Sequence, residues 1–170
     1  NDPTSSLALF ENIGNDSIPK YNLINRDWLG LSTTNLNTTL NIPALNLSPA
    51  FNDLDGDGNK DLIVGDADGK VHFFTNNGGN FQITNPNYQN IDVGQFAQPQ
   101  IIDVNRDGLN DLIIGEQDGT INYLPNSGTA TNAIFDTIIT NWGGVDVDQS
   151  YISIGFSNPT LYDSSGVYQL

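Results

Sequence analysis

The sequence predicts an all-β protein built from β-propeller blades, and three observations lead to that prediction. One pattern of short apolar runs and turns occurs twice, with a spacing of 50 residues. Each copy contains four runs of strand length, separated by clusters of Gly, Asn and Asp. No segment has the periodicity of a helix. A fixed repeat with four short strands per unit is typical of a propeller blade array.

The chain before the first copy predicts part of a blade. Residues 7–10 form an apolar run that a turn at residues 12–15 ends, and residues 21–24 are expected to pair with it in an antiparallel hairpin. Residues 30–44 lack clean periodicity and are expected to be mostly loop. Because residues 7–14 align with residues 71–78 of the first copy, the chain is expected to start inside a blade.

The first copy predicts four strands and an acidic loop. Asp68-Gly69 lies between the second and third strands and indicates a type I′ hairpin turn, because both central residues of that turn have positive φ. A second turn is expected at residues 76–79. The expected strands are residues 49–52, 62–64, 70–74 and one beginning at 81–84.

The second copy matches the first almost residue for residue, so four strands are expected there too. Pro99 corresponds to Pro49, and Asp118-Gly119 corresponds to Asp68-Gly69. A third, incomplete copy begins at Pro159 and reaches residue 170. Its loop keeps Asp163 as the only member of the acidic set.

These alignments predict four units along the chain. They are a partial blade of outer strands with a connecting loop (1–44), a blade with an acidic loop at 53–61 (45–94), a blade with an acidic loop at 103–111 (95–150), and the start of a further blade with a degenerate loop (151–170). A closed propeller needs about four to eight blades, and about three are present. The chain is therefore expected to be a segment of a larger secreted protein, or part of an assembly that supplies the remaining blades.

Composition limits the partners that the chain can have. The sequence has 5 basic and 20 acidic residues, with a net charge of −15, and this charge repels nucleic acid and anionic membranes. Eleven of the acids lie within residues 53–68 and 103–118, so the charge is local. The absence of cysteine excludes disulfides and thiolate metal sites. No apolar run approaches the ~18 residues of a membrane span.

The two acidic loops predict calcium sites. Asp53, Asp55, Asp57 and Asp61 occupy positions 1, 3, 5 and 9 of the first loop, with Gly58 at position 6. Ca²⁺ takes six to eight oxygen ligands at about 2.3–2.6 Å, and alternating acids turn several carboxylates toward one point. Position 7 can add its backbone carbonyl. Carboxylates this close repel one another strongly without a cation.

Three alternatives compete with this interpretation. An EF-hand needs a bidentate carboxylate at position 12 and flanking helices, but position 12 is Val64 or Ile114, inside expected strands. The glycine-rich nonapeptide of calcium β-rolls is absent. Solvated turns remain the simplest alternative, although two loops in register at one spacing favour metal sites.

At these residues the sequence resembles the FG-GAP/VCBS repeat family, the calcium-binding blades of integrin alpha-chain propellers and of many secreted bacterial proteins. The resemblance rests on residues 49–65 and their copy at 99–115. It implies a seven- or eight-bladed propeller with two Ca²⁺ ions in loops between the first two strands of a blade. The implied ligands are Asp53, Asp55, Asp57, the Asn59 carbonyl and Asp61 in the first loop, and Asp103, Asn105, Asp107, the Leu109 carbonyl and Asp111 in the second.

Little in the sequence supports catalysis. His72 is the only histidine and lies within an expected strand, so a structural role is predicted. With one histidine and no cysteine, the sequence lacks the residues of a Ser/His/Asp or Cys/His catalytic site and the ligands of a zinc hydrolase. A carboxylate-only glycosidase remains an alternative, but calcium ligation would keep the acids ionised. Trp28 and Trp142 could stack on sugars, although packing between blades is the preferred interpretation.

The sequence thus predicts a non-enzymatic, calcium-binding propeller region of a secreted or cell-surface protein, with a bacterial source favoured. Adhesion or protein–protein interaction is the expected function, through a protein or glycan ligand on the propeller face. The alternative is a propeller or carbohydrate-binding region accessory to a secreted enzyme that acts on polysaccharides. No nucleic acid and no membrane span are expected.

Overall fold

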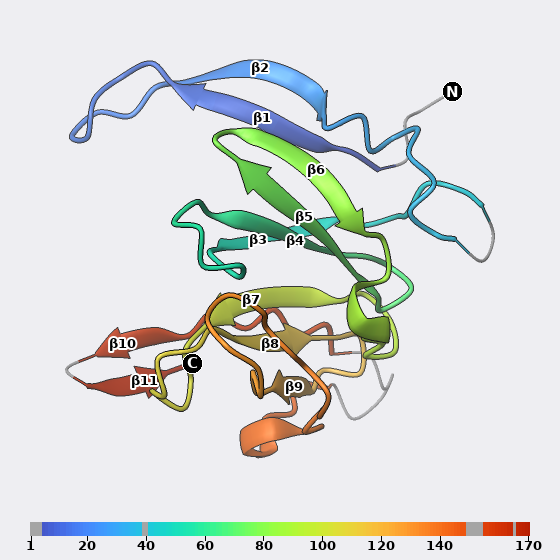
Figure 1. Cartoon of the computed structure of the whole chain (residues 1–170), viewed down its shortest axis with the longest axis vertical. Coiled ribbons are helices and arrows are strands. Elements are labelled where there is room, and N and C mark those ends of the chain that lie inside the picture. The colour runs from blue at the N-terminus through green and yellow to red at the C-terminus, as the bar shows by residue number, and fades with distance from the viewer. Residues whose placement is uncertain (1–4, 39–40, 149–154, 165) are drawn as a thin grey trace.

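The protein consists of four antiparallel sheets that follow one another along the chain and stack face to face (Figure 1). The computed structural model describes residues 5–38, 41–148, 155–164 and 166–170. Two short 3-10 helices, η1 (Tyr88–Asn90) and η2 (Trp142–Gly144), are the only helical elements in these residues. The all-β prediction is confirmed, and the stacked sheets are consistent with propeller blades.

The sheets contain two, four, three and two strands in chain order. Within each sheet, neighbouring strands are also consecutive in sequence, as expected for a meander. The strands are β1 (Leu7–Asn12) and β2 (Tyr21–Trp28); β3 (Ser48–Asn52), β4 (Asp61–Gly65), β5 (Val71–Asn77) and β6 (Asn80–Asn85); β7 (Gln98–Ile102), β8 (Asp111–Gly115) and β9 (Ile121–Leu124); and β10 (Tyr162–Ser164) and β11 (Val167–Gln169).

Strand register repeats between the second and third sheets. Ala50 pairs with Ile63 across β3 and β4, and Gln100 pairs with Ile113 at the same place across β7 and β8. The central strands β4 and β8 are buried along their whole length, which explains why their sequences are continuous apolar runs. The repeat predicted from the sequence is therefore also a structural repeat.

The expected fourth strand of the second copy is wrong. In its place the structure has isolated bridges: Thr129 pairs with Asn132, and Tyr123 and Ile139 exchange backbone hydrogen bonds of 2.9 and 2.8 Å. The side chain of Gln89 explains the difference, because it donates to the Ala133 carbonyl at 2.8 Å and accepts from the Phe135 N–H at 2.7 Å. The backbone groups of Ala133 and Phe135 therefore bond to the second sheet and do not pair with β9 as a fourth strand.

The predicted turn type is also wrong. The Asp66 carbonyl accepts a hydrogen bond from the Gly69 N–H at 3.2 Å, and the Asp66 N–H donates to the Lys70 carbonyl at 3.0 Å. Of the turn residues only Gly69 has a positive φ, of 74°. This is a three-residue loop with a left-handed glycine, the next most common hairpin connection after the two-residue turns.

Apolar side chains fill the spaces between successive sheets. The largest cluster joins the second and third sheets, and it includes Ile63 and Phe73 from one and Leu112 and Ile114 from the other. His72 lies wholly buried in the second sheet, where its Nε2 is 3.0 Å from an Asp66 carboxylate oxygen and its Nδ1 contacts the Pro86 carbonyl. These contacts fit the structural role that the sequence predicts for His72.

Both tryptophans contact other aromatic rings of the protein. The Trp28 ring packs edge-on against Phe81 with ring centroids 5.1 Å apart, and Trp142 packs on Tyr123 at 5.3 Å. Each is half-buried beside an apolar cluster. These contacts favour packing over a sugar-binding platform.

The segments that follow the second and third sheets bond to the hairpin tips of those sheets. Ala97 N–H donates to the Asp66 carbonyl at 2.9 Å, and the equivalent Ser157 N–H donates to the Glu116 carbonyl at 3.0 Å. In the first of these linkers Phe96 N–H also donates to Ala67, at 3.1 Å. We call these bonds the linker clasps, since they fasten each linker to the repeat before it.

No helix in the described part of the chain is long and apolar enough to cross a membrane.

Candidate metal centre

The β3–β4 and β7–β8 loops carry the acidic residues, and local hydrogen bonds shape both loops in the same way. In the first loop Asp55 accepts from the Asp57 N–H at 3.2 Å, and Asp57 accepts from the Asn59 N–H at 2.7 Å. In the second, Asn105 accepts from the Asp107 N–H and Asp107 from the Leu109 N–H, at 2.9 and 2.8 Å. Short polar side chains that bond backbone two residues ahead stabilise such turns.

The last acid of each loop is buried and connects the loop to the sheet. Asp61 accepts hydrogen bonds from the N–H groups of Leu54 and Asn76, both at 3.0 Å. Asp111 accepts from the equivalent Val104 and Asn126 N–H groups, at 3.0 and 2.8 Å. Each of these aspartates thus joins the loop after the first strand to an asparagine in or just after the third strand of its sheet.

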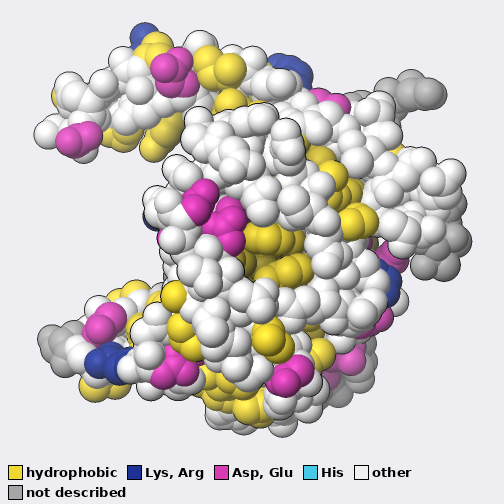
Figure 2. Space-filling view, viewed as in Figure 1, with side chains coloured by type: hydrophobic (Ala, Val, Ile, Leu, Met, Phe, Trp, Pro, Cys, Tyr) yellow, Lys and Arg dark blue, Asp and Glu magenta, His cyan; other side chains and the backbone are white. Residues whose placement is uncertain are grey.

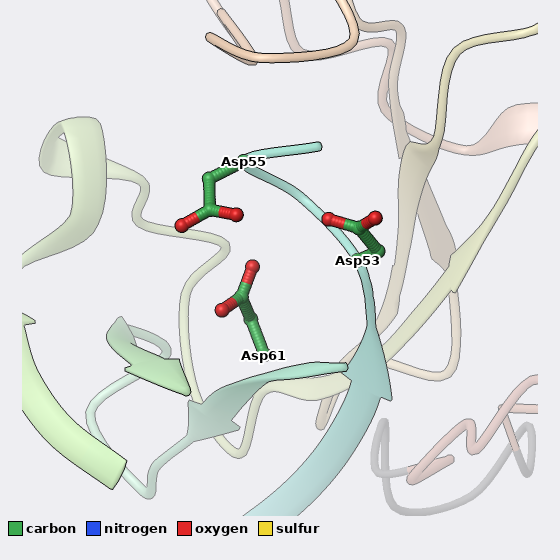
Figure 3. Close-up of side chains that lie close together, drawn as sticks. All are labelled: Asp53, Asp55 and Asp61. Carbon is green, nitrogen blue, oxygen red and sulfur yellow. The ribbon is translucent and has the colours of Figure 1, made fainter. Parts of the chain in front are cut away.

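Three carboxylates of the first loop converge on one point (Figure 3). Each of Asp53, Asp55 and Asp61 offers an oxygen that lies within 4.8 Å of the others'. Oxygens that share one Ca²⁺ at about 2.4 Å lie no farther apart than about 4.8 Å, so this donor set fits the ion. All three are hard oxygen ligands of the kind that Ca²⁺ prefers.

The remaining two predicted ligands of this loop are placed differently. The Asp57 carboxylate is exposed, lies outside the cluster of three, and accepts a second bond from the Asn59 side chain at 2.9 Å. This side-chain bond, together with the Asn59 N–H, lowers the pKa of Asp57. Asn59 therefore orients Asp57.

Burial sets the electrostatics of the cluster. It raises the pKa of Asp61, with the nearby negative charge of Asp55 acting in the same direction. The bonds from Leu54 and Asn76 oppose this shift, because they favour the ionised form. A buried carboxylate with two acidic neighbours is the environment in which a bound cation gains most.

The second loop has the same frame with fewer charges. Asn105 stands where the first loop has Asp55, and its side-chain amide donates to the Asp107 carboxylate at 2.9 Å. Asp103 accepts from the N–H groups of Asp107 and Gly108 at 3.2 and 2.9 Å. Leu109 bonds Asp107 through its N–H. The set keeps three carboxylates, those of Asp103, Asp107 and Asp111.

The two loops are in contact with each other. The Asn110 side chain donates to the Asp53 carbonyl at 2.8 Å, and the Asn52 side chain donates to the Asn110 side-chain oxygen at 3.2 Å. A cavity of about 190 Å³ lies between them, with Asp53 and Gly56 on one wall and Gly108 and Leu109 on the other. Loop 103–111 therefore supports loop 53–61.

The β10–β11 hairpin covers the second loop in a corresponding way. The Tyr168 hydroxyl donates to the Asp103 carbonyl at 2.6 Å. Arg106 lies over the Tyr168 ring, 4.9 Å from its centroid, and is 3.3 Å from the Asp163 carboxylate. The incomplete third repeat thus supports the loop of the repeat before it.

Several supporting residues were not predicted. Asn76 and Asn126 were treated only as turn residues, but the side chain of each also donates to the carbonyl before the buried aspartate, at 2.9 and 3.2 Å. Their recurrence at the repeat spacing was the available signal. Tyr123 donates its hydroxyl to Asp111 at 3.0 Å, where the first repeat has Phe73, and burial next to Asp111 raises the pKa of Tyr123.

Comparison with known proteins identifies the repeat. A family model described as the FG-GAP-like repeat matches residues 53–114, from the start of the first loop into β8. No curated protein and no solved structure matches the chain significantly. The matched residues include all of the first loop and the whole of the second. Residues 53–114 are therefore similar to an FG-GAP-like repeat, in agreement with the resemblance at residues 49–65 and 99–115.

Proposed function

We propose that the chain is a calcium-binding β-propeller region of a secreted or cell-surface protein, without enzymatic activity, that serves adhesion or protein–protein interaction. FG-GAP-like repeats often bind Ca²⁺, are typically non-enzymatic and are typical of extracellular proteins. The observation that carries the proposal is the convergence of Asp53, Asp55 and Asp61 within the span of one ion.

In this proposal Asp53, Asp55 and Asp61 would hold a first ion, with further oxygens from Asp57 and the Asn59 carbonyl. Asp103, Asn105, Asp107, the Leu109 carbonyl and Asp111 would hold a second. The ion supplies positive charge that offsets carboxylate repulsion. The chain's own frame, through Leu54 and Asn76 on Asp61, keeps the buried carboxylate fixed in the ion's absence.

The expected benefit is stabilisation of the blade edge. A site of extracellular grade has a Kd of about 10⁻⁴–10⁻³ M. At about 1 mM Ca²⁺ each site then adds about 0.4–1.4 kcal/mol to the free energy of unfolding. Calcium in this range stiffens the loops without determining whether the fold forms.

Calorimetric calcium titration tests the proposal. The unaltered chain is expected to bind two ions and to melt at a higher temperature in Ca²⁺ than in EGTA. The double variant Asp53→Asn, Asp55→Asn should lose one ion, because two of the three converging carboxylates lose their charge. Asp92→Asn is the matched control, since Asp92 pairs with Lys70 away from the loops. Absence of binding, with an intact fold in EGTA, would contradict the proposal.

The ligand-binding part of the proposal has its own test. A rigid sheet stack that presents loops suits a broad protein or glycan contact. Glycan and protein arrays, probed with the chain in Ca²⁺, separate the adhesion proposal from the alternative of a region accessory to a polysaccharide-acting enzyme. The aromatic contacts of Trp28 and Trp142 weigh against a sugar platform made of those two rings.

A further inference from the structure

The β1–β2 hairpin has the structure of the last two strands of a repeat. Asn12 ends β1, Asn76 is the last but one residue of β5, and Asn126 follows β9. In each case the asparagine side-chain oxygen accepts from a turn N–H, of Gly14, Gly79 and Gly128, at 2.9, 2.6 and 2.9 Å. β1 therefore corresponds to β5, and β2 corresponds to β6.

β1 has a partner on one edge only. In the second sheet β5 lies between β4 and β6, but among the described residues β1 pairs with β2 alone. The Ile13 N–H donates to the Lys20 carbonyl across the hairpin at 2.8 Å. Since successive N–H groups of an antiparallel strand point to opposite edges, the Asn12 N–H points to the unpaired edge of β1.

The face of the second sheet next to this edge is uncovered. Phe51 on β3 is 44% exposed, whereas Ile101, its equivalent on β7, is 7% exposed because the second sheet packs over it. The two residues occupy the same register, opposite Leu62 and Leu112. Ile101 is covered by a strand pair, β3 and β4, whereas no equivalent pair of the described residues covers Phe51.

A groove of about 500 Å³ marks the vacant position. It runs between the β1–β2 hairpin and β3, where Figure 2 shows the surface hollowed beneath the hairpin, with hydrophobic side chains along the hairpin's lower edge. Its apolar walls are Leu7, Leu9, Phe10, Trp28, Phe51 and Phe81.

Asn12 indicates what the missing strands carry. In the complete repeats the Asn76 N–H donates to Asp61 and the Asn76 side chain donates to the Lys60 carbonyl. Among the described residues the Asn12 side-chain amide donates to nothing, although its oxygen is bonded. The vacant position therefore offers one donor for a carboxylate and one for the carbonyl just before it.

We propose that the groove and the free edge of β1 dock the first two strands of a further repeat of the same kind. The second docked strand begins with an aspartate that accepts from Asn12, pairs with β1, and places an aliphatic side chain equivalent to Ile63 over Phe51. The result is a four-stranded sheet like β3–β6. This inference does not rest on calcium binding, because strand pairing and apolar burial carry it.

A second copy of the chain is a poorer occupant. Its β10–β11 hairpin corresponds to first and second strands, since Tyr162 pairs with Gln169 as Asn52 pairs with Asp61. The position of the docking aspartate is thus Gln169, which brings no carboxylate to Asn12.

An extended chain tests the proposal. A copy of residues 47–69 replaces residues 1–5, so that its last glycine precedes Ser6 as Gly69 precedes Lys70. In EGTA, the Asn12 amide is expected to exchange its hydrogen at least tenfold more slowly than in the unextended chain, and Tm is expected to rise by about 5 °C. The matched control carries Asp61→Ala and Ile63→Asp within the added copy only, and it should show neither effect.

Three results would overturn the proposal. They are unchanged Asn12 exchange in the extended chain, equal protection in the control extension, and self-association of the unaltered chain that Phe10→Glu abolishes. The last result would assign the groove to a second copy. Because every arm is run in EGTA, failure here is distinguishable from failure of the calcium proposal.

Discussion

The repeats that contain β3–β6 and β7–β9 share a backbone frame but differ in the side chains that complete it. Both bury an aspartate at the start of the second strand and bond it to the loop and to an asparagine in or just after the third strand. The first repeat adds Asp55 and Phe73, where the second has Asn105 and Tyr123. The hydrogen bonds to the buried aspartate are therefore common to both repeats, whereas the number of loop carboxylates differs. Each of the two features can be tested separately.

Removal of the buried aspartates should have the largest effect. Asp61→Ala leaves two N–H groups without acceptors, and we expect a loss of about 2–5 kcal/mol in the free energy of unfolding. Asp111→Ala should cost about 1 kcal/mol more, because the Tyr123 hydroxyl also loses its acceptor. Urea denaturation in EGTA measures both. Asp57→Ala is the exposed control and should change the value by less than about 0.5 kcal/mol; equal effects for all three variants would refute the frame.

The uncovered and covered faces should respond differently to truncation. Ile101→Ala removes a buried side chain between two sheets and should cost about 2–4 kcal/mol. Phe51→Ala, although it removes a larger side chain, should cost about 1–2 kcal/mol because Phe51 is already nearly half exposed. Thermal denaturation of the two variants decides the order. A larger loss for Phe51→Ala would mean that its face is covered in solution.

Substitution of two glycines in the first loop distinguishes the cost of backbone strain from the cost of steric crowding. A Cβ on Gly56 would lie 2.8 Å from the Ala130 carbonyl oxygen, whereas one on Gly58 meets nothing within 4 Å, and both residues have positive φ. Gly58→Ala should cost about 1–2 kcal/mol from backbone strain alone. Gly56→Ala should cost about 1 kcal/mol more. Chemical denaturation of both variants measures the difference. Equal losses in the free energy of unfolding would show that residues 126–132 move aside without cost.

The smallest expected effect concerns the charge of the second loop. Asn105→Asp gives the second loop a fourth carboxylate, at the position that Asp55 occupies in the first loop. The affinity of a site for Ca²⁺ depends on the charge of its ligands. We expect the second site to tighten on the order of tenfold, equivalent to about 1.4 kcal/mol. Calorimetry on Asn105→Asp, with the reciprocal Asp55→Asn as its partner, checks this. If Asn105→Asp changed the affinity of the first site only, Asn105 would not be a ligand of the second site.

The sequence predicted those parts of the molecule that local patterns determine. The β3–β4 and β7–β8 loops, the hairpin of β1 with β2, and the repeat register follow from apolar alternation and glycine placement. The turn at Asp68-Gly69 was placed correctly but given the wrong type, because a dipeptide does not determine loop length.

Contacts between residues far apart in the chain could not be predicted from the sequence. The fourth strand of the second repeat is missing because Gln89, more than 40 residues earlier, binds the Ala133 and Phe135 backbone. In the same way, Tyr168 and Asn110 reach loop carbonyls from neighbouring repeats. Among the candidate ligands, the acidic spacing predicted which residues line the loop. It did not distinguish Asp57, which lies beside Asn59, from the three that converge.

The linker clasps have a mechanical consequence. Because Ala97 and Ser157 bond the hairpin tips of the repeats before them, a pull on one linker loads the neighbouring sheet's turn before it reaches that sheet's own ladder. Tension along the chain is thus shared between adjacent repeats. A protein under load would gain resistance to stepwise unravelling from this arrangement, since the second and third sheets cannot be separated without breaking the clasp that Ala97 makes on Asp66.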